Sequence, residues 1–209
     1  KLAEAMARLG DVYVSDAFGA VHRAHASTEG AAQHFKQRAA GFLVAAELQY
    51  FDKILHRPDR PLVAILGGAK VSDKIQVIEN LLGLVDALLI GGGMCFTFLK
   101  AQGHEIGNSL LDAAALDTAR SALAIARDKR VELVLPVDAV IADRFAADAA
   151  FRVVDLGNIE AGWMGLDIGP KTVARFGEVL DRAKTDGGNG PLGAVEMMGE
   201  QAHPGTTVP

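Results

Sequence analysis

Residues 62–74 carry the feature that most limits how this chain can fold. An apolar run over residues 62–66 ends at Gly67-Gly68 and leads at once into a segment that carries Lys70 and Lys74. This pattern predicts a buried strand, a tight turn and the start of a helix. Amides at such a turn favour anions, and lysines four positions apart on a helix share one face. We expect both ammonium groups to reach one polyphosphate. The alternative is a plain turn with two solvated lysines.

Composition and charge narrow the class of protein. Of the 209 residues, 50% are hydrophobic and 22% are charged, which suits a globular core and excludes wholesale disorder. A net charge of -5 gives no electrostatic footprint for nucleic acid. No apolar stretch reaches membrane-spanning length. The single cysteine, Cys95, provides neither a disulfide framework nor a cysteine-based zinc site. We therefore expect a cytoplasmic protein that binds neither nucleic acid nor membrane.

Helical and strand patterns alternate along the chain. Helical patterns cover residues 2–9, 42–55, 71–83, 96–99, 111–128 and 172–183, and strand patterns cover 12–14, 62–66, 88–90, 131–135, 140–141 and 153–154. This order predicts an α/β fold, with a Rossmann-like, mostly parallel sheet and helices on both faces. The proline-containing stretch at residues 57–61 predicts a domain boundary.

Glycine turns follow several of these predicted strands, at Gly67-Gly68, residues 91–93, Gly169 and Gly190. Because ligands bind at the carboxyl ends of parallel strands, these turns predict close approach of the backbone to a ligand. A dinucleotide-binding domain is the rival interpretation, but Phe96 stands where the third glycine of Gly-x-Gly-x-x-Gly would be. The P-loop pattern Gly-x-x-x-x-Gly-Lys-[Ser/Thr] is also absent. The turns indicate a nucleotide site of another kind.

Six segments resemble phosphoglycerate kinase in residue identity, order and spacing. They are residues 16–19, 22–25, 67–74, 91–100, 135–138 and 162–170. The resemblance is continuous over residues 1–184 and patchy beyond them. It implies phosphoryl transfer between 1,3-bisphosphoglycerate and ADP with Mg²⁺, in glycolysis or carbon fixation. It also implies two domains that close around a cleft, and a full-length protein that is monomeric.

The resemblance assigns a role to each part of the chain and also implies the partners of the protein. Residues 1–41 would be a remnant of the N-terminal substrate domain, 42–60 the interdomain helix and linker, and 61–209 the nucleotide-binding domain, incomplete at its C-terminus. The implied partners are ADP or ATP, phosphoglycerate and Mg²⁺, with the principal metal-binding aspartate outside this chain. Asp73 and Asp138 are further candidate metal ligands, although Asp73 also fits as first-turn charge on a helix.

The resemblance also implies roles for individual residues. Lys70 would neutralise the moving phosphoryl group, Lys74 the nucleotide phosphates, and Arg23 would bind the acidic substrate from the other side. The remaining implied nucleotide contacts are Gly68, Ala69, Gly92, Gly165, Asn189 and Glu196. Phosphoryl transfer requires chiefly positioning and positive charge, so these roles need no side-chain nucleophile. Cys95 is interpreted as a small buried residue.

The chain also departs from the family pattern. It lacks the family's first block and the Gly-Gly-Asp-[Thr/Ser] turn, whose aspartate binds the metal. Before Asn189, where the family has an apolar strand, stands Asp186-Gly187-Gly188, a sequence that disfavours a strand. We expect this chain alone to bind nucleotide weakly without turnover. The alternative is a non-catalytic nucleotide-binding module derived from the same fold.

Overall fold

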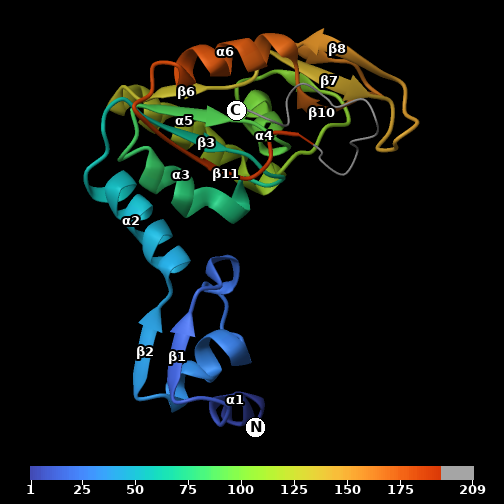
Figure 1. The fold of residues 1–209 in the computed structure, drawn as a ribbon. Coiled ribbons are helices and arrows are strands. Elements are labelled where there is room, and N and C mark those ends of the chain that lie inside the picture. The colour runs from blue at the N-terminus through green and yellow to red at the C-terminus, as the bar shows by residue number, and fades with distance from the viewer. Residues whose placement is uncertain (194–209) are drawn as a thin grey trace. The chain divides into compact units, whose positions relative to one another are not determined.

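The computed structural model describes residues 1–193 (Figure 1). The chain divides into two compact units, Lys1–Arg57 and Pro58–Pro209, called unit 1 and unit 2 below. The division falls where helix α2 ends, at His56, just before Pro58. Proline cannot continue a helix and restricts the residue before it, which explains why the helix stops there.

Unit 1 is built on a small two-stranded sheet. Helix α1 (Leu2–Ala7) precedes strand β1 (Val12–Ser15), which pairs in parallel with β2 (Gln37–Ala40). Three short helical turns, η1 (Phe18–Ala20), η2 (Ala26–Gly30) and η3 (Ala32–His34), connect the strands. Helix α2 (Phe42–His56) follows, and the Asp16 carboxylate accepts a hydrogen bond from the Val44 amide in its first turn, at 3.0 Å.

Unit 2 contains the main sheet, four parallel strands in the order β11-β3-β4-β6. These strands span Leu62–Leu66 (β3), Ala87–Ile90 (β4), Glu132–Val134 (β6) and Thr185–Asn189 (β11). A second, antiparallel sheet has the order β10-β7-β8, and β5 (Glu105–Ile106) pairs with β9 (Asn158–Ile159). The antiparallel strands span Asp138–Ala142 (β7), Phe151–Asp155 (β8) and Met164–Ile168 (β10).

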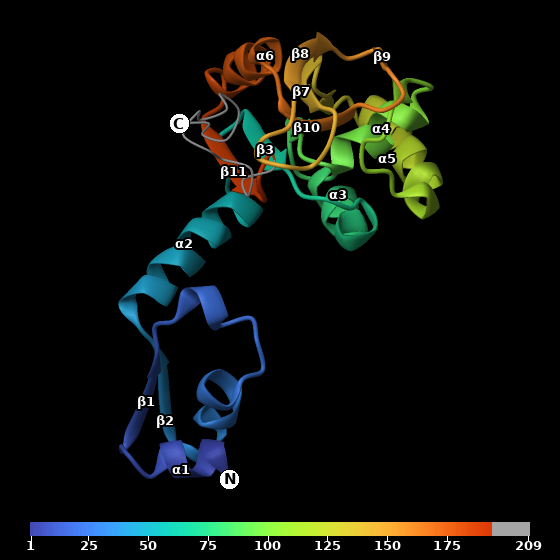
Figure 2. The same cartoon turned by 90° about the vertical axis from the view of Figure 1, so that its right-hand side faces the viewer.

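Helices cover the main sheet on both faces. They are α3 (Ile75–Leu81), α4 (Met94–Ala101), α5 (Leu116–Lys129) and α6 (Pro170–Leu180), with short turns η4 (Ser72–Lys74) and η5 (Ala113–Ala115). Helix α6 lies on one face and α3 on the other (Figure 1, Figure 2). Strand β4 shows why both faces are needed. Leu89 packs in the cluster with Phe176 of α6, whereas Leu88, one position earlier, is also fully buried and points to the opposite face.

The predicted fold class, a mostly parallel sheet with helices on both faces, is confirmed. The expectation that Asp186-Gly187-Gly188 would disfavour a strand is wrong, because these residues form most of β11 and pair with β3. In the described sheet β11 is an edge strand, so its side chains need not fill a core. The antiparallel sheet was not predicted, since a short buried run such as β7 carries no signal for the direction of its partners.

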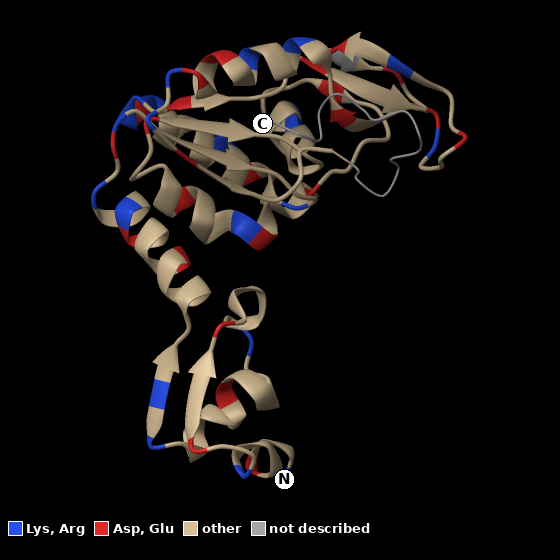
Figure 3. Cartoon of the chain, viewed as in Figure 1, with Lys and Arg blue, Asp and Glu red and all other residues tan. Residues whose placement is uncertain are grey.

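The part of the chain that the structure describes has no helix long and apolar enough to cross a membrane. Charges of both signs alternate along the helices and loops of unit 2 (Figure 3).

Candidate functional site

Three glycine-containing turns meet at the carboxyl edge of the main sheet. They are residues 67–69 after β3, 91–93 after β4 and 190–192 after β11. Backbone hydrogen bonds join them: the Gly92 amide donates to the Leu192 carbonyl at 2.9 Å, and two further bonds of 2.9 and 3.1 Å connect the first turn to the chain around the third. The parallel register brings the strand ends together, and the turns then hold one another.

The glycines in these turns are required by contacts within the chain. A Cβ on Gly67 would lie 2.0 Å from the Pro191 carbonyl oxygen, and one on Gly92 would lie 2.6 Å from the Gly68 nitrogen. Gly92 also has a φ of +63°, which side-chain-bearing residues rarely adopt. The close approach expected at Gly67 and Gly92 is thus made in part by a neighbouring turn of the same chain, and approach of a ligand at these turns stays a prediction.

A cavity of about 510 Å³ opens beside the joined turns, entirely within unit 2. Its size is typical of small-molecule sites. The lining residues are Gly68, Ala69, Gly92, Gly93, Asn108, Leu110, Phe145, Met164, Gly165, Leu166, Pro191 and Gly193. Four residues singled out from the sequence, Gly68, Ala69, Gly92 and Gly165, are thus brought to one cavity. Gly169 is not among the residues that line it, because it precedes α6 at the end of the antiparallel strand β10.

Sequence reasoning missed the apolar side chains of this cavity, Leu110, Phe145, Met164 and Leu166. Met164 and Leu166 flank Gly165, so the prediction of Gly165 as a nucleotide contact could have indicated them as well. Leu110 and Phe145 come from loops without periodic pattern.

Gly165 is held tightly on the cavity wall. Its amide donates to the Ser109 hydroxyl at 2.9 Å, and a Cβ at this position would overlap the ring of Phe96 at 2.0 Å. A glycine is therefore needed here to let strand β10 lie against helix α4. This contact joins the antiparallel sheet to the helix that follows the second glycine turn.

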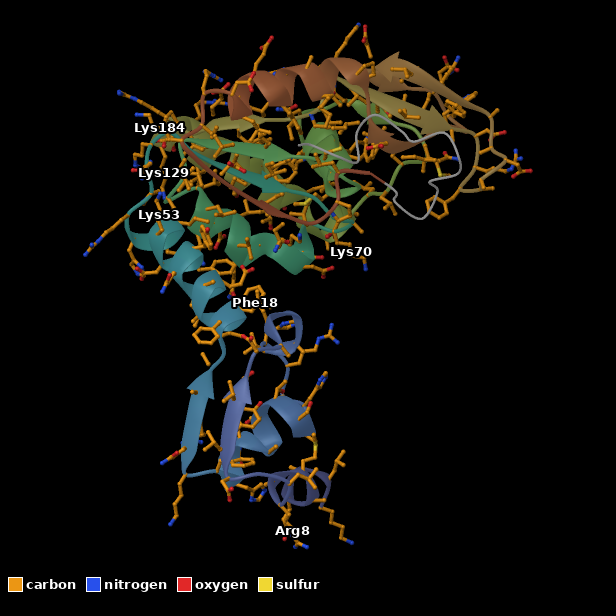
Figure 4. The ribbon with its side chains drawn as sticks, viewed as in Figure 1. Arg8, Phe18, Lys53, Lys70, Lys129 and Lys184 are labelled. Atoms are coloured by element: carbon orange, nitrogen blue, oxygen red, sulfur yellow. The ribbon has the colours of Figure 1, made fainter. Side chains whose placement is uncertain are left out.

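Lys70 and Lys74 do not stand one turn apart on an α-helix, so that part of the sequence prediction is wrong. Lys70 belongs to the turn after β3, Lys74 closes the short η4 turn, and α3 begins only at Ile75. Figure 4 shows the Lys70 side chain at this turn. Lys70 is exposed and has no hydrogen bond to any described residue.

Lys74 is occupied by the protein itself. Its ammonium donates to the Gly67 carbonyl at 2.8 Å, to the Asn189 carbonyl at 3.2 Å and to the Asn189 side-chain oxygen. An ammonium has three N–H donors, so these acceptors saturate it. Partial burial lowers the pKa of Lys74 below its usual value. In this state Lys74 fastens β11 to the β3 turn, and a phosphate would have to replace one of these acceptors.

The family model described as phosphoglycerate kinase matches residues 1–207. The chain belongs to the phosphoglycerate kinase family. It is 54% identical over 198 residues to the phosphoglycerate kinase of Acidobacterium capsulatum and 56% identical over 196 residues to that of Roseiflexus castenholzii. Each comparison covers 94% of this chain and 49% of the relative.

Solved structures of phosphoglycerate kinase share the fold. The enzyme from Coxiella burnetii matches with a TM-score of 0.79 at 43% identity, over 93% of this chain and 50% of that one. The enzyme from Pyrococcus horikoshii matches with a TM-score of 0.77 at 27% identity, over 93% and 49%. The chain therefore spans about half the length of the phosphoglycerate kinases that it matches.

The other residues that the family resemblance singled out lie in different settings. Asn189 is exposed at the end of β11. Arg23 belongs to unit 1, where it is exposed and its Nε contacts the His22 ring at 3.3 Å. Glu196 falls outside the described residues.

Two residues considered for chemistry have structural roles. The buried Asp138 carboxylate accepts hydrogen bonds from the Lys171 and Thr172 amides, at 2.9 and 2.7 Å, and from the Thr172 hydroxyl at 2.6 Å. It therefore stabilises the start of α6 and has little capacity left for a metal. Cys95 is buried behind the second glycine turn, and burial raises the pKa of its thiol well above the usual value. It is a packing residue, as the sequence suggested.

No group of three or more potential metal-ligating side chains gathers among residues 1–193.

Proposed function

We propose that the cavity in unit 2 binds ADP or ATP, and that the chain supplies the nucleotide half of a phosphoglycerate kinase. The proposed reaction is reversible transfer of a phosphoryl group from 1,3-bisphosphoglycerate to ADP, which gives 3-phosphoglycerate and ATP. One observation carries the proposal. Backbone from two glycine turns lines a cavity of nucleotide size, and Lys70 follows directly on the wall residue Ala69.

The lining of the cavity suits the parts of a nucleotide. Leu110, Phe145, Met164 and Leu166 offer apolar surface for a planar base. Gly68 leaves space on the wall beside the lysine-bearing turn, because a Cβ there would meet only the Lys74 side chain, at 3.6 Å. Phosphates bound beside Gly68 would therefore lie close to both lysines of the turn.

The chemistry requires little from the protein beyond position and charge. As an oxygen of the ADP β-phosphate bonds to phosphorus, the bond from phosphorus to the acyl oxygen of 1,3-bisphosphoglycerate breaks, and a carboxylate leaves. We assign Lys70 to the negative charge on the transferred group, since its ammonium is exposed and not hydrogen-bonded to described residues. The buried thiol of Cys95 takes no part.

The remaining assignments follow the family resemblance. Lys74, Asn189 and Glu196 would contact the nucleotide's phosphates and ribose, and Arg23 would bind the acidic substrate. Residues 1–41 would then belong to the substrate domain, 42–60 to the connection and 61–209 to the nucleotide domain. We also propose a cytoplasmic location, since a tobacco relative that is 54% identical is named cytosolic.

A second candidate is a nucleotide-binding module without catalysis. The cavity lies wholly in unit 2, whereas Arg23 lies in unit 1, where Ala31 and Val44 are the buried hydrophobic residues. So small a core does little to fix the position of the Arg23 side chain. We expect the purified chain to bind ADP weakly and to show no measurable turnover in a coupled assay.

Calorimetric titration with ADP, with and without Mg²⁺, tests the proposed function. A Lys70→Ala, Lys74→Ala variant should lose at least roughly tenfold in affinity, because two charged contacts to phosphate are removed. The matched control is Lys129→Ala, Lys184→Ala, which removes the same charge at the opposite end of unit 2 (Figure 4). Its affinity should equal that of the parent chain.

Other results would redirect the assignment. Equal loss in both double variants would show a general charge effect and remove the site assignment. Preference for NAD over ADP would revive the dinucleotide-binding interpretation. Turnover by this chain would contradict the binding-only expectation and favour the full kinase reaction.

A further inference from the structure

The segment 108–112 touches two parts of the candidate site. At one end Asn108 and Leu110 line the cavity. At the other end the Asp112 carboxylate accepts a hydrogen bond from the Ser72 amide at 2.9 Å, just after the turn that carries Lys70. One short connection therefore links the cavity wall to the lysine-bearing turn, although Asp112 and Ser72 are 40 residues apart in sequence.

Asp112 is fixed in place by the core. Its amide donates to the hydroxyl of Thr97 at 3.0 Å, and Thr97 is fully buried in α4. Its carbonyl accepts a hydrogen bond from the Ala115 amide at 3.0 Å. The Asp112 carboxylate thus projects from an anchored backbone toward the Ser72 amide.

Asp112 also faces the positive charge of that turn. Hydrogen bonds donated by the Ser72 side chain and backbone hold the pKa of the Asp112 carboxyl below its usual value, and the Lys70 ammonium acts in the same direction. The carboxylate is consequently ionised at neutral pH. Its hydrogen bond to the Ser72 amide holds the carboxylate two residues along the chain from Lys70, whose ammonium has no hydrogen bond to a described residue.

We propose that Asp112 is a positioning residue that holds the Lys70 turn and serves as an internal counter-anion to Lys70. The inference rests on the proposed function, because it concerns a site for nucleotide phosphates. Bound ADP places its phosphates near the same ammonium. The Asp112 carboxylate then repels the phosphates while it retains the Lys70 charge, so it weakens nucleotide affinity and sets where Lys70 stands before binding.

Titration of Asp112→Asn with ADP and with adenosine tests the charge. Asparagine keeps an oxygen that can accept from the Ser72 amide but removes the negative charge. ADP affinity should rise roughly two- to fivefold, the range expected for an interaction between exposed, solvent-screened charges, and adenosine affinity should not change. Asp112→Ala also removes the acceptor, so its gain should be smaller. The matched control is Asp128→Asn, an exposed carboxylate on α5, which should leave both affinities unchanged.

A double-mutant cycle with Lys70→Met shows whether the effect passes through Lys70. In that background Asp112→Asn should give no gain in ADP affinity. A gain that persists without Lys70 would overturn the proposal. So would an equal loss of ADP and adenosine affinity in Asp112→Asn, which would mean that the residue only supports the fold.

A ligand-free measurement separates this inference from the proposed function. Carboxyl NMR titration of Asp112 should show a higher pKa in Lys70→Met than in the parent chain. If the parent binds neither ADP nor adenosine, the proposed function fails for this chain, yet the titration still decides whether Asp112 and Lys70 are paired. An unchanged Asp112 pKa would refute the pairing.

Discussion

Unit 1 and unit 2 contain similar kinds of residues but bury them very differently. In unit 1, Phe42 is 95% exposed and Leu9 is 87% exposed, and the buried hydrophobic residues are Ala31 and Val44. In unit 2, whole strands such as β4 are buried, and Phe176 is fully enclosed. Both units have strands and helices. Only unit 2, among the described residues, has the enclosed core that normally stabilises them.

This difference in burial affects how firmly each unit can hold functional side chains in position. The two strands of unit 1 form a pair that is marginal on its own, because a two-stranded sheet needs a packed apolar face. The turns beside the cavity, in contrast, extend from strands held between two helical layers. Hydrogen bonds can fix the position of a side chain such as Lys74 in that setting. Arg23 has no comparable support within unit 1.

Substitutions in the two units should have effects of very different size. Phe176→Ala should lower the free energy of unfolding of unit 2 by about 3–5 kcal/mol, because it leaves a cavity in the core. Phe42→Ala in unit 1, at an exposed position, should change the free energy of unfolding by less than about 0.5 kcal/mol. Urea unfolding followed by circular dichroism and by fluorescence of Trp163, the single tryptophan, provides both values. Equal destabilisation would mean that the Phe42 side chain is buried in solution.

Glycine substitutions should also affect the stability of the two units to different extents. Gly92→Ala should destabilise unit 2 by about 1–3 kcal/mol, because the backbone there has a positive φ and the added Cβ would press on Gly68. Gly19→Ala in unit 1, where nothing lies within 4 Å of the added atom, should change stability by less than about 0.5 kcal/mol. Thermal melts of both variants provide the measurement. A neutral Gly92→Ala would show that the three turns separate readily.

Local patterns explain what could be predicted from the sequence. Residues 62–66 are predicted as a strand and form β3 with the same bounds, since an apolar run that ends in two glycines leaves few alternatives. Helix α2 is predicted over residues 42–55 and ends at His56, because Pro58 stops it. The turns that carry Gly68 and Gly92 were predicted for the same reason, because turn chemistry is local, whereas Ala69 and Gly165 on the cavity wall were named by the family resemblance.

Long-range contacts explain what could not be predicted. The acceptors of Lys74 include Asn189, which is 115 residues away in sequence and comes near only through the pairing of β11 with β3. Spacing within residues 70–74 carries no information about that partner. Phe145 also lines the cavity, and the local sequence of its loop does not predict that position. The role of Asp138 at the start of α6 likewise depends on a contact 34 residues along the chain.

The smallest expected effect concerns an ion pair on the surface of unit 2. Lys171 of α6 donates to Asp155 of β8 at 2.6 Å, and this hydrogen bond and the negative charge of Asp155 raise the pKa of Lys171 above its usual value. A raised folded-state pKa stabilises the fold below the unfolded value near 10.5 and loses that effect as pH rises through the folded value. Asp155→Asn should therefore lower the urea midpoint slightly at pH 7 to 9 and converge with the parent only above about pH 10.5, as pH rises through the folded value. Unit 1 should not respond, so hydrogen exchange of β1 and β2 is the internal control. A difference that grows with pH would have the wrong sign and would show that the pair does not stabilise unit 2.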